Sequence, residues 1–188
     1  YRGNQSFVYG DPATYVCSNH FGASTGGWAL VMMNYTATPS EDGQQIGIAL
    51  QGSFFDFVEL GVDEPASATP VLSTLPITVP DWSFEGQNPP NNLGAPWKGY
   101  GFAARPGQDG LNIRPYHGGI AATGGRNGAP ARQVLADTFK RGLVYTLSSQ
   151  TYSRGDSAWY YFKQYIFRAD QEPQMTNTIP TAWLATEY

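Results

Sequence analysis

The chain has 188 residues, of which only 14% are charged and 14% are aromatic, with 22 glycines and 14 prolines. This length fits a single domain spanning residues 1–188, large enough to fold without a metal ion or a disulfide. Cys17 is the only cysteine, which excludes an intrachain disulfide framework. The net charge of −4 argues against a nucleic-acid partner, because phosphate binding usually requires a basic surface.

The composition also limits the fold class. No apolar run approaches the ~20 residues that span a bilayer, so we expect no membrane insertion. Glycine, proline, aromatic and β-branched residues predict short strands linked by structured loops. We therefore predict an all-β fold, either an antiparallel β-sandwich or a compact β-barrel, with long loops rich in aromatic residues, proline and glycine.

The first half of the chain predicts several strands. Residues 28–35 are apolar at nearly every position, so we expect a strand covered on both faces. Asp42-Gly43 then predicts a hairpin turn into an alternating strand at residues 44–51. Residues 54–60 alternate again after Gly52, which marks a turn or a bulge.

The middle of the chain is less regular. Its prolines limit residues 61–79 to short edge strands, and residues 81–110 form an irregular stretch whose length is typical of a functional loop. Residues 111–116 predict a short strand, followed by a glycine-rich run at residues 118–128. Residues 133–139 predict a helical turn.

The last third predicts two long strands, at residues 143–147 and 159–168, joined by a short polar turn. Both faces of the second strand are aromatic, so it is either central to two layers or covered by a partner chain. This pattern predicts a homodimer or a homotrimer, since a monomer rarely exposes a large apolar patch. The expected core includes Trp28, Leu30, Phe55, Phe57, Leu143, Tyr145, Phe162 and Ile166.

Two segments are candidates for binding a receptor. The polar turn contains Arg154, Gly155 and Asp156, which match the integrin-recognition triplet. At a hairpin tip, a glycine turn presents a carboxylate that completes a metal site in the receptor and a guanidinium that meets an acidic pocket. The alternative is a polar turn with this sequence by chance.

The second candidate is the aromatic loop, which carries Trp82, Trp97, Tyr100, Phe102 and Arg105. Aromatic rings cover the apolar faces of sugars or anchor protein interfaces, while charged groups add directional hydrogen bonds. We favour this loop as the site. The alternative is that the rings fill the interior beneath the loop.

Catalytic residues are few. Asp56, Glu59, Asp63 and Glu64 could supply the two carboxylates of a glycoside hydrolase. Asp56 and Glu59 point to opposite faces of one strand, however, which favours an exposed acidic edge. Cys17 and His20 have the spacing of half a metal site but lack further ligands.

Two other groups have weaker catalytic or anion-binding interpretations. Cys17 with His117 as a base could form a nucleophilic pair, although a buried thiol and a loop histidine are the better interpretation. The glycines at 124–128 could form an anion-binding nest, but they lack the ending of a phosphate loop. We therefore expect neither catalysis nor a metal or other cofactor.

The segment from residue 140 to residue 169 resembles the late strands of calicivirus-type protruding domains. Lys140-x-Gly142-x-Val144 is followed, after a polar turn, by Tyr-Phe-x-x-Tyr-Ile-x-Arg at residues 161–168. With the single cysteine, the few charges, the aromatic loops and a start at Tyr1 that looks cut from a longer chain, the sequence resembles the protruding or spike domains of non-enveloped virus capsids.

This resemblance implies host-cell attachment. It implies a module on the virion surface, assembled in the host cytoplasm, that binds a host glycan or a protein receptor such as an integrin without catalysis. The alternatives are a secreted carbohydrate-active enzyme and a free-standing lectin. The acidic composition and two N-glycosylation triplets, at Asn4 and Asn34, do not decide between them.

Overall fold

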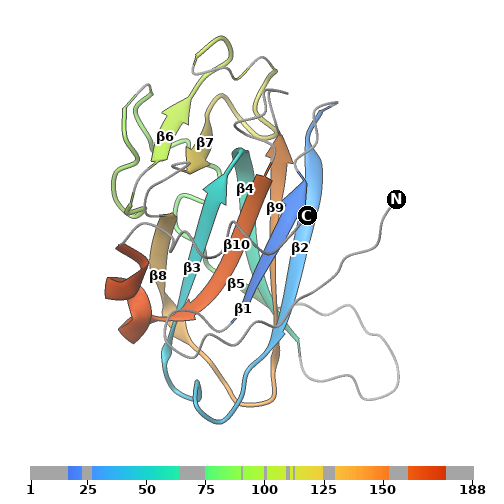
Figure 1. Ribbon diagram of the computed structural model, residues 1–188, viewed down its shortest axis with the longest axis vertical. Helices are drawn as coiled ribbons and strands as arrows, with labels where there is room; N and C mark the ends of the chain where they lie inside the picture. The colour runs from blue at the N-terminus through green and yellow to red at the C-terminus, as the bar shows by residue number, and fades with distance from the viewer. Residues whose placement is uncertain are drawn as a thin grey trace, which may run out of the picture.

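The structure is a computed structural model that describes residues 17–22, 27–63, 75–89, 91–99, 101–108, 111, 113–124, 130–152 and 161–176. Two antiparallel sheets pack against each other, which confirms the all-β prediction as a β-sandwich (Figure 1). One sheet has the strand order β1 (Cys17–Gly22), β10 (Tyr161–Arg168), β3 (Gln45–Gly52) and β8 (Ala131–Thr138). The other has the order β2 (Ala29–Thr36), β9 (Val144–Tyr152), β4 (Phe54–Asp63), β7 (Ala121–Gly124) and β6 (Gly101–Ala104).

Two short elements complete the described architecture. β5 (Leu75–Ile77) pairs with β4, and the 3₁₀-helix η1 (Ala169–Thr176) follows β10. Figure 1 shows β6 and β7 at the upper end of the sandwich, with the connections from β2 to β3 and from β8 to β9 at the lower end. No helix in the described part of the chain is long and apolar enough to cross a membrane.

A chain of buried aromatic rings connects the two sheets. The ring of Phe55 in β4 lies 5.8 Å from that of Phe162 in β10 and 5.4 Å from that of Phe84. Phe84 in turn packs 5.1 Å from Trp97, which is only 1% exposed. The Trp97 indole N–H donates to the carbonyl of Asp81 at 3.1 Å. Phe84 and Trp97, which lie outside the named strands, are therefore part of the core.

β10 is buried on both faces, as its aromatic pattern predicts. Phe162 and Ile166 point into the core between the sheets. On the opposite face Tyr165 and Phe167 are also buried, and the Phe167 ring lies over Gly47, where any side chain would collide with it. The second aromatic face is thus covered within this chain, and its burial gives no support to a partner chain on it.

The two predicted hairpins are wrong, because the two strands of each belong to different sheets. β2 pairs with β9 and not with β3, so the Asp42-Gly43 turn crosses from one sheet to the other. β9 and β10 are likewise in different sheets, and the segment that contains Arg154-Gly155-Asp156 lies outside the described residues. At Gly52, where φ is +105°, the chain passes from β3 to β4 through Ser53 alone.

Two local predictions also fail. Residues 133–139 form most of β8 and not a helical turn, because β8 pairs with β3 along the edge of the four-stranded sheet. Gln133 points inward there and donates to the carbonyl of Pro80 at 3.2 Å. The described residues between 111 and 116 form no strand, although Leu111 is buried.

The predicted core is mostly confirmed. Phe55, Tyr145, Phe162 and Ile166 are buried, while Trp28 and Leu143 pack at its edges. The prediction is wrong for Leu30, because one face of β2 is exposed to solvent. On that face Leu30 is 54% exposed and Met32 is 46% exposed. The prediction is also wrong for Phe57, whose side chain belongs to the candidate site described below.

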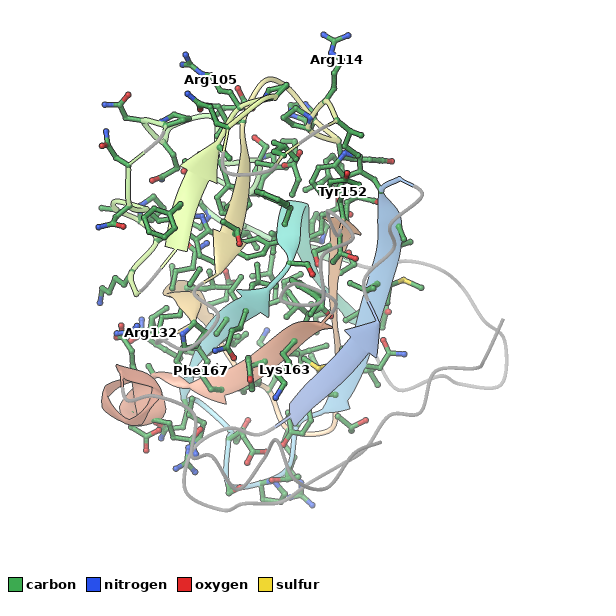
Figure 2. The ribbon with its side chains drawn as sticks, turned by 45° about the horizontal axis from the view of Figure 1, so that its top comes forward. Arg105, Arg114, Arg132, Tyr152, Lys163 and Phe167 are labelled. Atoms are coloured by element: carbon green, nitrogen blue, oxygen red, sulfur yellow. The ribbon has the colours of Figure 1, made fainter. Side chains whose placement is uncertain are left out.

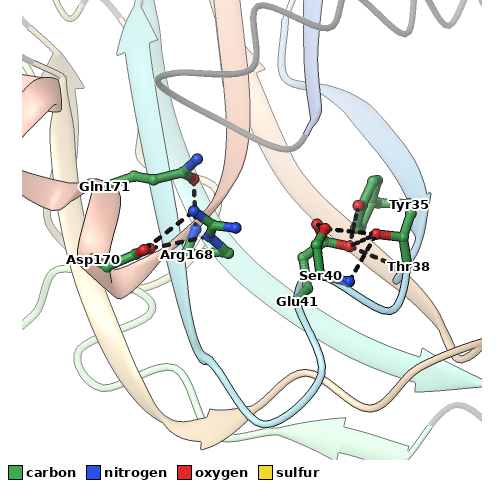
Figure 3. A network of polar contacts seen from close by, with 7 residues as sticks. All are labelled: Tyr35, Thr38, Ser40, Glu41, Arg168, Asp170 and Gln171. Carbon is green, nitrogen blue, oxygen red and sulfur yellow. Dashed lines mark hydrogen bonds and ion pairs between the residues drawn. The ribbon is translucent and has the colours of Figure 1, made fainter.

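A buried carboxylate organises the lower end of the sandwich (Figure 3). Glu41 accepts hydrogen bonds from the Tyr35 hydroxyl at 2.7 Å, from the Thr38 N–H at 2.6 Å, and from the hydroxyls of Thr38 and Ser40. Burial raises its pKa, but these hydrogen bonds outweigh burial and lower the pKa of Glu41 to about 2. The network fixes the crossing between β2 and β3.

Replacing Glu41 with Gln should destabilise the protein by about 1.5–3 kcal/mol, the range for hydrogen bonds to a charged group. The stabilisation by Glu41 should be complete above its unfolded pKa near 4.5 and be lost as the pH falls toward 2, because the folded pKa is lowered. Urea unfolding of both proteins between pH 2 and pH 7 measures this difference. Equal unfolding free energies at neutral pH would contradict the assignment.

Candidate functional site

A bulge in β4 turns one aromatic ring out of the core. Asp56 pairs with Gln150 of β9, but Glu59 pairs with Ser148, so β4 contains one more residue than its partner between these points. The backbone is left-handed at Phe57, with φ of +52°. Val58 therefore occupies the core position that the alternation predicts for Phe57, and the Phe57 ring is half-buried at the surface.

The adjoining segment after β5 is strained in the same way. Phe57, Asp81 and Phe84 are the non-glycine residues with positive φ in the described part of the chain. The bulge and this segment are joined by the Val58 N–H, which donates to the carbonyl of Trp82 at 2.9 Å. Left-handed residues cost about 1–3 kcal/mol each and concentrate at functional sites, so this region is the strongest candidate for one.

Four side chains meet at this point and are called the aromatic cluster below. The Phe57 ring lies 4.8 Å from Trp82, 5.5 Å from Tyr116 and 6.0 Å from His117, and Trp82 lies 4.7 Å from His117. Tyr116 is 52% exposed and His117 is exposed, while Phe57 and Trp82 are half-buried. Trp82 also packs against the main core, which makes the cluster continuous with it.

Two carboxylates hold the loop that carries Tyr116 and His117. Asp56 accepts the His117 N–H at 2.8 Å and the Phe57 N–H at 2.7 Å. Glu85 accepts the N–H groups of Gly119 and Ile120, both at 2.9 Å. The loop is thus fixed at both ends by backbone hydrogen bonds to carboxyl groups, and such bonds are stronger when the acceptor is ionised.

Asp56 is buried, and burial raises its pKa to about 7. The backbone donors of His117, Phe57 and Tyr116 act in the opposite direction, and the negative charge of Glu85 adds to the rise. The carboxylate beneath the aromatic cluster therefore changes its charge near neutral pH.

The structure separates the residues of the predicted aromatic loop. Trp82 belongs to the aromatic cluster, whereas Trp97 is enclosed in the core, as the alternative of rings filling the interior predicts. Phe102 is half-buried in β6, opposite Thr123 of β7. Arg105 is exposed, and Figure 2 shows it with Arg114 at one end of the sandwich, away from Arg132. Tyr100, Arg154, Gly155 and Asp156 lie outside the described residues.

The proposed acidic edge is wrong for Asp56, which is buried and not exposed, although Glu59 is exposed. Asp63 lies at the end of β4 and is half-buried. Cys17 and His20 lie in β1, whose side chains are not described, and His117 is in the aromatic cluster. In the described ranges, no group of three His, Cys, Asp or Glu could hold a metal ion.

Sequence reasoning missed Phe57 and Tyr116 as site residues, and it considered His117 only as a base for Cys17. Residues 54–60 fit an alternating strand, and no glycine next to Phe57 signals the bulge there. Tyr116 and His117 directly precede Gly118 and Gly119. The two glycines indicate a turn, and a turn beside aromatic residues was the available signal for this part of the site. Gly118 has φ of +61° and faces Glu85, whose carboxylate occupies the space of any side chain there.

Comparisons with protein-family models, with curated proteins and with solved structures found no match to this chain. The functional interpretation consequently depends on the geometry of the chain itself.

The stability of the protein should depend on the charge of Asp56. Because its folded pKa of about 7 exceeds the unfolded value of 3.8, the folded state holds a proton that the unfolded state releases. Stability should therefore fall as the pH rises from about 4 to about 7, by at most about 1.4 kcal/mol per pH unit.

The variant Asp56→Asn isolates this effect. Asn does not titrate, so the variant should lose the Asp56 contribution to the pH slope, whatever its absolute stability. Asp137→Asn, at an exposed aspartate of β8, serves as the matched control and should keep the slope. Denaturant unfolding from pH 4 to pH 8 provides the readout, and identical slopes for Asp56→Asn and the unmodified chain would exclude this role.

Proposed function

We propose that this chain is a non-catalytic binding module that recognises a glycan through the aromatic cluster. One observation carries the proposal: a strained bulge removes the Phe57 ring from the core and places it beside Trp82, Tyr116 and His117. A purely structural role would leave Phe57 in the core, where its burial stabilises by about 1.5–3 kcal/mol. Partly exposed aromatic rings are typical anchors of binding surfaces.

The rings of the cluster pack at steep angles to one another. Their centroids are separated by 4.7 to 6.0 Å, and Phe57 meets Trp82 and Tyr116 edge to face, at interplanar angles of 84° and 71°. An aromatic cage for an ammonium group requires instead rings that surround an opening. The exposed ring of Tyr116 fits the apolar face of a sugar ring, and the exposed His117 supplies a polar contact.

The carboxylates near the cluster support binding and not hydrolysis. A glycoside hydrolase needs two carboxyl groups that face the scissile bond across a cleft. Asp56 is buried and both of its oxygens accept backbone hydrogen bonds, and Glu85 also accepts two. These groups position the loop, so the enzyme alternative has no available acid and base among them.

The biological setting of this binding comes from the sequence resemblance alone. If the chain is a protruding domain of a non-enveloped capsid, the glycan is a host receptor and the module is a homodimer or homotrimer on the virion surface. A free-standing lectin uses the same cluster without a capsid. Sedimentation of the purified chain measures whether it forms the homodimer or homotrimer that the capsid setting implies.

Replacing Tyr116 with Ala should weaken binding of the best ligand from a glycan array by roughly 30-fold, because an anchor residue contributes about 2 kcal/mol or more. Tyr116→Phe should retain most of the affinity, since it keeps the ring. Tyr116 is half exposed, so its truncation should leave the fold intact, as circular dichroism can verify. Trp82→Ala should weaken binding similarly.

Two controls make the result specific. Met32→Ala removes an exposed apolar side chain on β2, outside the cluster, and should have no effect on binding. Asp156→Ala should also be silent, whereas loss of cell binding in that variant would favour the integrin triplet. Trp97→Ala is unsuitable as a probe, because truncating a buried tryptophan costs about 3–5 kcal/mol of stability. Unchanged glycan affinity in both Tyr116→Ala and Trp82→Ala would exclude the aromatic cluster.

A further inference from the structure

The guanidinium of Arg132 is buried with unused hydrogen-bond donors. Arg132 lies in β8 opposite Ala49 of β3, on the outer face of the four-stranded sheet, and is only 7% exposed. Its Nε and Nη1 atoms are buried without a hydrogen-bond acceptor in the described part of the structure. An arginine stays charged at all accessible pH values, and a buried donor without an acceptor costs about 1–3 kcal/mol or more.

Arg168, a second arginine of the same protein, has its side-chain donors paired with a carboxylate. Arg168 donates from Nε and Nη2 to the two carboxylate oxygens of Asp170, at 3.0 and 3.1 Å (Figure 3). That bidentate geometry is the one that matches a guanidinium to a carboxylate. Among the described residues Arg132 has no such partner, and the carboxylate recorded beside it there is that of Glu172, with Oε1 at 3.5 Å from Nε.

Glu172 is shared between two cations. The Lys98 ammonium lies 3.1 Å from the same oxygen, Oε1, and 3.3 Å from Oε2. Lys98 and Arg132 are held side by side by two backbone hydrogen bonds of 2.8 Å each. The three side chains therefore carry a net charge of +1, and Glu172 satisfies Lys98 better than Arg132.

The Arg132 guanidinium is bounded by backbone on one side. Gly99 has φ of +101°, and a Cβ there would lie 2.1 Å from the Pro130 carbonyl oxygen and 2.8 Å from Arg132 Nη1. Of the three charged side chains, that of Lys98 is the most exposed, at 60%, so the group borders solvent at Lys98. Figure 2 shows Arg132 close to η1, the element that carries Glu172.

We propose that Arg132 and Lys98 form a binding site for the carboxylate of a small acidic ligand, and that Glu172 is the internal carboxylate that competes for it. The ligand replaces Glu172 on Lys98 and Arg132 and also takes the Arg132 donors that Glu172 leaves unused, while η1 releases Glu172 toward solvent. Carboxylate is the favoured class because the resident partner is itself a carboxylate. The proposal is independent of the aromatic cluster, which consists of other residues.

The test is a nuclear magnetic resonance titration of the whole chain with sodium acetate and with glucuronate, at constant ionic strength against sodium chloride. Acetate tests for binding of a simple carboxylate, and glucuronate tests for binding of the carboxylate of an acidic sugar. Saturable shifts at the amides of residues 98, 132 and 172 with either acid, and none with chloride, are expected. Shifts that never saturate, or that chloride reproduces, would overturn the proposal.

Substituting Glu172, the competing carboxylate, should change the apparent Kd in the opposite direction from substituting Arg132 or Lys98. If Glu172 occupies the site about nine-tenths of the time, Glu172→Gln should tighten the apparent Kd roughly tenfold. Arg132→Lys, which keeps the charge but loses the fork, should weaken it, and so should Lys98→Gln. Lys140→Gln changes the charge equally at an exposed residue outside the site and should have no effect.

If the Arg132 variant fails to fold, the Glu172→Gln variant still tests the proposal. A Glu172→Gln protein that is folded and binds acetate no more tightly than the unmodified chain shows that Glu172 is a structural partner only. That result would reject competition at this site.

Discussion

One inserted residue in β4 is the constraint on which the candidate site depends. Because the side chains of a strand alternate, a single extra residue exchanges the faces of all positions beyond it. Phe55 before the bulge and Val58 after it both point into the core, and Phe57 between them does not. The inner face of the sheet stays apolar on both sides of the bulge, while one aromatic ring is moved to the surface.

The strain at this bulge is offset by packing that the neighbouring segment makes with the core. Phe84 has φ of +59° and is fully buried between Phe55 and Trp97. Asp81, also left-handed, accepts the Trp97 indole N–H on its carbonyl and the Gly86 N–H on its side chain. Burial of two large aromatic side chains contributes several kcal/mol, which is enough to hold the strained positions. The same contacts fix Trp82 at the edge of the core.

The sequence predicts where most strands lie but not how they pair. β3, β4, β9 and β10 follow from their apolar and aromatic runs, because those patterns depend only on the local alternation. Sheet membership depends on contacts between distant segments, such as β2 with β9, and a turn like Asp42-Gly43 is compatible with either a hairpin or a crossing. Trp82 and Trp97 illustrate the same limit for the site, since both lie in one loop and only the core contacts of Trp97 distinguish them.

Two buried carboxylates show how this fold sets charge by the balance between burial and hydrogen-bond donors. Glu41 receives hydroxyl and N–H donors from three residues, and its pKa falls to about 2 although burial alone raises it. Asp56 receives backbone donors only and lies near Glu85, so burial prevails and its pKa rises to about 7. The lower end of the sandwich is therefore fixed by a group that stays an anion at neutral pH, because its pKa is about 2. The loop under the aromatic cluster is instead held by a group whose charge changes near neutral pH, and when Asp56 is protonated the His117 N–H loses the stronger, charged acceptor. The display of Tyr116 and His117 is thus tied to a weaker anchor than the rest of the fold, and Glu85 becomes the main charged contact that keeps this loop in place.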